Sequence, residues 1–129
     1  MANQFVVQLK NEPGAMANLA EALAARGVDL RAIGGGGIGD SGHVIMTTAD
    51  DATTKAILDE GGYAYIEGES ILTEVDDKPG GMASLSRQLA DAGVNIYGHL
   101  FLGRWGDRAM FTFVVDQPEI ARPILERKS

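Results

Sequence analysis

Apolar residues recur with the same spacing in two separate stretches of the chain. Residues 11–30 (NEPGAMANLAEALAARGVDL) and residues 77–96 (DKPGGMASLSRQLADAGVNI) lie 66 positions apart and are identical at nine of 20 positions. In the first stretch Met16, Leu19 and Leu23 stand at i, i+3 and i+7, which places them on one face of a helix. The second stretch repeats that spacing, so the pattern predicts two copies of one structural unit.

Each copy has the pattern of a strand, a helix, two further strands and a second helix. Runs rich in β-branched and apolar residues predict the strands, and Gly-Asp turns between them predict hairpins. The first helices are expected to begin at Pro13 and Pro79, because proline suits the first helical position, and to end before Gly27 and Gly93. The predicted strands are residues 5–9, 29–33, 43–49 and 63–67 in the first copy, and 70–75, 95–102 and 108–115 in the second.

Second helices follow the third strands, with Asp51 and Asp116 as their expected N-caps. This order predicts an α+β fold made of two ferredoxin-like βαββαβ modules. We place the modules at residues 1–67 and 68–129, and we expect the second to lack its last strand. The unpaired edge of residues 70–75 then predicts a homodimer, or an intimate pairing of the two modules, because open strand edges attract other strands.

Composition narrows the class of partner. A formal net charge of −7 and a pI near 4.7 argue against nucleic acid and against anionic membrane surfaces, since both repel an acidic protein. Cysteine is absent, which excludes disulfides and thiolate chemistry, and no apolar run approaches the ~20 residues of a membrane helix. Because the first residues do not resemble a secretion signal, the chain is expected in the cytoplasm.

The turns before the two first helices are the best candidates for chemistry. A helix N-terminus exposes unpaired N–H groups, so the amides of Gly14, Ala15 and Met16 could receive a carboxylate. Asn11 in the first copy and Asp77 in the second could accept a hydrogen bond from the ammonium group of the same amino acid. The simpler alternative is that both side chains only cap the turn.

The other motifs of the sequence predict neither a bound cofactor nor a catalysed reaction. The run GGGGIG at residues 34–39 contains the spacing of a dinucleotide fingerprint, but it ends a second strand and leads into a turn. We interpret it as a flexible edge or hairpin connection. His43 and His99 have no second ligand at metal-binding spacing, and no nucleophile stands with a general base. We therefore expect no metal, no cofactor and no catalytic residue.

The Asx-x-Pro-Gly turn, the apolar helix and the following Gly-Val-Asx-hydrophobic strand resemble the ACT domain family of small-molecule-binding regulatory modules. The likeness spans both copies and is that of tandem ACT proteins without an attached enzyme. It implies an amino-acid-binding regulatory protein, not an enzyme, which acts through ligand-dependent assembly or through a partner such as a regulated enzyme. The alternative is a structural or oligomerisation module without a ligand. By this resemblance the ligand-binding candidates are Asn11, Pro13, Gly14, Ala15, Met16, Asp77, Pro79, Gly80, Gly81 and Met82.

The second turn is expected to be the stronger site. Asp77 carries a charge that Asn11 lacks, and Gly81 is expected to leave more room beside the helix than its alanine counterpart in the first copy. His99 and Phe101, on the second strand of that copy, are expected to face the bound ligand.

Overall fold

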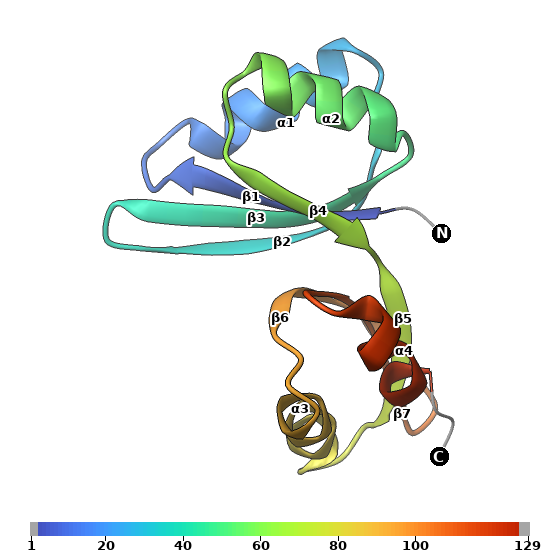
Figure 1. Cartoon of the computed structure of the whole chain (residues 1–129). Helices are drawn as coiled ribbons and strands as arrows, with labels where there is room; N and C mark the ends of the chain where they lie inside the picture. The colour runs from blue at the N-terminus through green and yellow to red at the C-terminus, as the bar shows by residue number, and fades with distance from the viewer. Residues whose placement is uncertain (1–2, 127–129) are drawn as a thin grey trace. The chain divides into compact units, whose positions relative to one another are not determined.

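The computed structural model describes residues 3–126, and the chain divides into two compact units between Gly68 and Glu69 (Figure 1). Unit 1 is the part before this point and unit 2 is the part after it. Each unit builds its own apolar core. No helix among the described residues is long and apolar enough to cross a membrane.

Unit 1 is a four-stranded sheet with two helices on one face (Figure 1). Its elements are β1 (Asn3–Lys10), α1 (Ala15–Ala25), β2 (Leu30–Ile38), β3 (Ser41–Thr48), α2 (Asp51–Glu60) and β4 (Tyr65–Glu69). The strands lie in the order β2-β3-β1-β4, and β3 is antiparallel to both β1 and β2. Alternate strand residues face the helices, so Phe5, Val7 and Met46 are buried in one core with Leu19 and Leu23 of α1.

Unit 2 repeats this plan with three strands. Its elements are β5 (Ile71–Asp76), α3 (Gly81–Asp91), β6 (Ile96–Trp105), β7 (Arg108–Val115) and α4 (Pro118–Leu125). The strands lie in the order β5-β7-β6, and Phe113 of β7 is buried in one core with Leu85, Leu89 and Leu125. The α+β class and the ferredoxin-like plan are confirmed. Within the described part of unit 2 no strand takes the place that β4 has in unit 1, so β5 pairs with β7 alone.

Both first helices end as their glycines predict. In unit 1 the N–H of Gly27 donates to the carbonyl of Ala24, and the N–H of Val28 donates to the carbonyl of Leu23, both at 3.0 Å. Gly27 has a φ of 71°, so the helix ends in a Schellman motif, whose left-handed residue favours glycine. Gly93 repeats the motif in unit 2 with a φ of 77°.

The predicted starts of these helices are wrong by two residues. α1 begins at Ala15, because Pro13 and Gly14 form the centre of a type II β-turn. The φ of Gly14 is 90°, and the N–H of Ala15 donates to the carbonyl of Glu12 at 3.3 Å. The turn before α3 has the same form, with a glycine φ of 89°. The Pro-Gly pair therefore encodes a turn that precedes each helix rather than the first helical residues.

The predicted cap of α2 is also displaced by one residue. The N-cap is Asp50, and Asp51 is the first helical residue. The carboxylate of Asp50 accepts hydrogen bonds from the hydroxyl of Thr53 at 2.6 Å and from its N–H at 3.0 Å. These bonds hold the pKa of Asp50 below its usual value of 3.8, because they favour the charged form.

The predicted cap of α4 is wrong because unit 2 contains one extra residue. β6 bulges between Phe101 and Gly103, so Leu102 has no partner on β7. From there the two copies lie 67 rather than 66 positions apart, which puts Gln117 at the N-cap of α4. Asp116 instead accepts a hydrogen bond from the N–H of Asn95 at 2.8 Å, at the start of β6.

Candidate functional site

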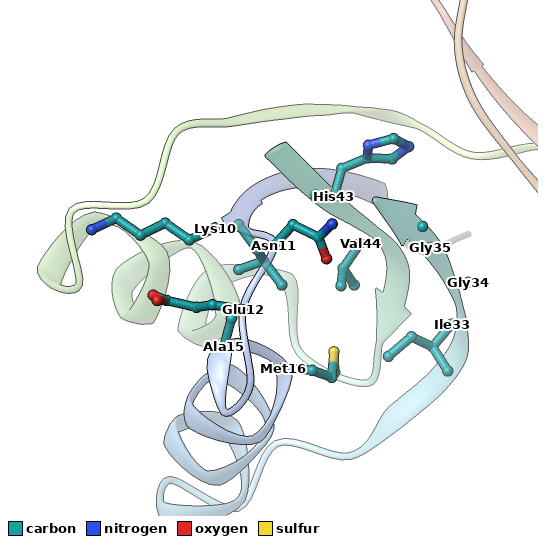
Figure 2. A pocket seen from close by; sticks show the side chains of 13 residues that line it. Lys10, Asn11, Glu12, Ala15, Met16, Ile33, Gly34, Gly35, His43 and Val44 are labelled. Carbon is teal, nitrogen blue, oxygen red and sulfur yellow. The ribbon is translucent and has the colours of Figure 1, made fainter. Parts of the chain in front are cut away.

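A hollow of about 260 Å³ lies in unit 1 between the turn that precedes α1 and the glycine run of β2 (Figure 2). Its apolar walls include Met16 of α1, Ile33 of β2 and Val44 of β3. Of the residues predicted for this copy, Asn11, Ala15 and Met16 line the hollow, whereas Pro13 and Gly14 only shape the turn beside it.

The glycine run is part of β2 and forms one side of the hollow. The sequence predicts that this strand ends at Ile33, but its pairing with β3 continues to Ile38 opposite Ser41. The glycine run does lie on an edge strand of the sheet, as interpreted, but the expected end of that strand at Ile33 is wrong. A Cβ atom on Gly35 would lie 2.5 Å from the carbonyl oxygen of His43. Because no side chain fits there, this face of the strand stays bare.

Asn11 lies across the same strand. A Cβ atom on Gly37 would be 2.7 Å from the Cγ of Asn11, so only glycine lets the side chain take this position. The Nδ2 of Asn11 donates to the carbonyl of Gly39 at 2.9 Å, and α1 has no side-chain cap. The capping alternative is therefore wrong for Asn11. Within residues 3–126 no hydrogen bond reaches its Oδ1, which remains available as an acceptor.

The start of α1 supplies donors to this region. The first bond of the helical ladder runs from the N–H of Asn18 to the carbonyl of Gly14 at 2.9 Å. The amides of Met16 and Ala17 come before that bond and have no acceptor within the helix. Together with the partial positive charge of a helix N-terminus, these amides favour an anionic group.

The charged side chains near the hollow do not form a cluster. Lys10 and Glu12 point away from its interior in Figure 2, although both contribute to its rim. Across the described residues, no three histidine or acidic side chains lie together so that they could hold a metal ion. The hollow offers apolar, amide and backbone contacts.

In unit 2 residues with side chains stand where the strand of unit 1 has two of its glycines. The strand registers put Phe101 where unit 1 has Gly35, and Arg104 where it has Gly37. The Nε of Arg104 donates to the Oδ2 of Asp77 at 2.8 Å, and its Cζ lies 5.0 Å from the ring centroid of Phe101. Asp77 does not cap α3. Its carboxylate already has a cationic partner from the same chain.

The other residues predicted for unit 2 are only partly brought together. A cavity of about 470 Å³ lies beside the turn, and the predicted residues that line it are Asp77, Pro79, Met82 and Phe101. Gly80 and Gly81 line a different cavity. The ring of His99 lies 6.1 Å from that of Phe113 and lines neither cavity.

The expectation of extra room at Gly81 is wrong. A Cβ atom on Gly81 would lie 2.2 Å from the carbonyl oxygen of Asp76. The glycine is needed because β5 and the start of α3 approach each other closely, so it opens no space for a ligand.

Sequence reasoning missed the residues that make the two sites different, namely Gly35, Gly37 and Arg104. The signal was present in the repeat, since the run IGGGGI of the first copy aligns with the aromatic segment HLFLGRW of the second. The inserted residue at Leu102 blurs that alignment.

No protein-family model matches the chain, and no curated protein matches it. Solved structures do. A protein from Bacteroides thetaiotaomicron has a TM-score of 0.71 at 19% identity, over 97% of this chain and 86% of that one. The chain has the fold of this protein. The regulatory subunit of aspartate kinase from Thermus flavus also has this fold. Its TM-score is 0.67 at 17% identity, over 98% of this chain and 92% of that one. The Thermus thermophilus subunit follows at 0.59 and 20%, over 97% and 89%.

Proposed function

We propose that this chain is an amino-acid-binding regulatory protein of the ACT type rather than an enzyme. The observation that carries the proposal is the hollow of unit 1, where Asn11 and the start of α1 meet the bare glycine face of β2. Two proteins with the same fold are regulatory subunits of aspartate kinase, which supports a role in controlling another protein.

The contacts of the hollow match the parts of an amino acid. The amide of Met16, which has no acceptor within the helix, suits its carboxylate, and the Oδ1 of Asn11 suits its ammonium group. Ile33 and Val44 suit an apolar side chain laid over Gly35. A volume of about 260 Å³ favours a small amino acid over a large one.

The test is a panel of free amino acids, screened by thermal shift and followed by calorimetry on the best binder. A ligand of the native state at 100 times its Kd stabilises the protein by about 2.7 kcal/mol, which raises the melting temperature measurably. Gly37→Ala is the sharpest variant, because its new methyl group displaces Asn11 from its place on the strand. We expect Gly37→Ala and Asn11→Ala each to weaken binding about tenfold.

Gly36→Ala is the matched control, because a Cβ atom there meets nothing within 4 Å. We expect it to bind as the unaltered chain does. A panel in which no amino acid binds would contradict the proposal and favour a structural module without a ligand. Equal loss of binding in Gly36→Ala and Gly37→Ala would show that the glycine strand matters for folding and not for contact with the ligand.

We also propose that the protein is a homodimer and that ligand acts through its assembly or through a regulated partner enzyme. The support is the edge of β5, which pairs only with β7 in the described part of the chain, while the equivalent β1 in unit 1 has a neighbour on both sides. Unpaired strand edges bind further strands. Sedimentation equilibrium with and without the best ligand tests this, and a monomer under both conditions at micromolar concentration contradicts it.

A further inference from the structure

The cavity of unit 2 differs from the hollow of unit 1 in already containing a cationic group. We propose that Asp77 and Phe101 form a guanidinium-binding site, and that the chain's own Arg104 occupies it and closes unit 2 to free ligand. The closure to free ligand rests on the proposed function of unit 1, whereas the guanidinium site does not.

The geometry of Arg104 is that of a bound guanidinium. Its Nε donates to the Oδ2 of Asp77 at 2.8 Å, and its Cζ lies 5.0 Å from the ring centroid of Phe101. A guanidinium is planar, so it can present N–H groups to a carboxylate while its face rests on an aromatic ring. The ring of Phe101 is itself held by Phe111, with the centroids 5.4 Å apart.

The ion pair is exposed to solvent, and its two partners are exposed to different degrees. Exposed pairs contribute little because water screens them. The side chain of Asp77 is 31% exposed, and it lies in a cavity of about 470 Å³ whose lining includes the apolar side chains of Met82 and Ala109. The side chain of Arg104 is 65% exposed, so it can leave without breaking the core of unit 2.

The two units differ at two strand positions, with Phe101 in the place of Gly35 and Arg104 in the place of Gly37. Gly37 of unit 1 stands in the position of Arg104 and carries no side chain, so Asn11 lies across the strand beside the hollow. In unit 2 the guanidinium of Arg104 contacts both groups that could recognise a ligand, the carboxylate of Asp77 and the ring of Phe101. A chain with this asymmetry binds one free amino acid, in unit 1.

The test removes the internal occupant and offers a free one. Arg104→Ala is preferred to glycine, because its methyl group keeps Asp77 from lying across the strand as Asn11 does in unit 1. The probe is methylguanidinium, which has no ammonium and carboxylate pair and so does not report on the amino acid site. Binding is followed by NMR at the backbone amides of Phe101 and Met82 in the full chain.

We expect saturable shifts at these amides in Arg104→Ala, with an affinity for methylguanidinium at least about tenfold higher than in the unaltered chain. Arg31→Ala is the control for charge, because Arg31 is an exposed arginine on the edge strand of unit 1 and pairs with Asp29 only at 3.5 Å. It should behave as the unaltered chain. The double variant Asp77→Asn with Arg104→Ala should lose the gain.

Absence of binding in a folded Arg104→Ala protein would overturn the guanidinium site, and so would equal binding in the unaltered chain. Calorimetry of the amino acid identified for unit 1 tests closure separately. One bound amino acid per chain supports closure of unit 2. A second bound amino acid that is lost in Asp77→Asn overturns it. Failure of the amino acid panel alone would overturn the proposed function and leave the methylguanidinium result standing.

Discussion

Unit 1 and unit 2 have the same turn before the first helix but different strands beside it. Both turns are type II, with glycine φ values of 90° and 89°, and both helices lack a side-chain cap. Beside the first turn runs a strand of glycines, and beside the second runs a strand that carries Phe101 and Arg104. The turn therefore has the same form in both units, and the units differ in the strand that lies beside it.

The two strands also differ in their backbone geometry. β2 lies so close to β3 that Gly35 tolerates no Cβ atom. β6 has Phe101 at the equivalent place, and the bulge at Leu102 follows it directly. A one-residue insertion thus accompanies the change from a bare strand to one that carries side chains.

The largest effect is expected from Gly35→Ala, which puts a methyl group 2.5 Å from the carbonyl oxygen of His43. The backbone must shift, so we expect unit 1 to lose about 1–3 kcal/mol of stability. Gly36→Ala on the same strand should change stability by less than about 0.5 kcal/mol. Hydrogen exchange measured separately in each unit checks both. A loss of equal size in the two variants would show that strand entropy, and not close approach, requires the glycines.

A smaller and equal effect is expected where the two units are alike. Gly27→Ala and Gly93→Ala each place a side chain on a left-handed residue, with φ values of 71° and 77° and no neighbour within 4 Å. The strain should destabilise the unit concerned by about 1 kcal/mol in each case. Chemical denaturation of the two variants checks this. A difference of more than about 1 kcal/mol between them would break the equivalence of the two helix ends.

The smallest effect concerns pH and distinguishes α2 from α4. Bonds from Thr53 lower the pKa of Asp50 in the folded state, so the cap stabilises α2 above the usual value of 3.8 and is lost as pH falls through the lower folded value. The N-cap of α4 is Gln117, which is neutral and makes no side-chain cap hydrogen bond. NMR titration should show the pKa of Asp50 rising toward 3.8 in Thr53→Ala. An unchanged pKa would assign the shift to other groups.

Much of the fold can be read from the chain. The repeat, the helical spacing of its apolar residues and the glycines at 27 and 93 are local patterns, and local patterns determine helices, turns and their order. They predict two ferredoxin-like units. Errors of one or two residues arise where two local signals compete, as when Pro13-Gly14 is read as a helix start although it forms a type II turn.

The tertiary structure alone decided which side chains lie beside each turn. Asp77 and Arg104 are 27 residues apart, and nothing local indicates that a strand would bring the guanidinium onto the carboxylate. Likewise the need for glycine at position 35 follows from its short distance to the carbonyl oxygen of His43 on the neighbouring strand. The sequence by itself determined the two turns and the helices behind them, because their hydrogen bonds join residues close in the chain. The groups that lie beside those turns depend on contacts between strands, which exist only once the sheet has formed.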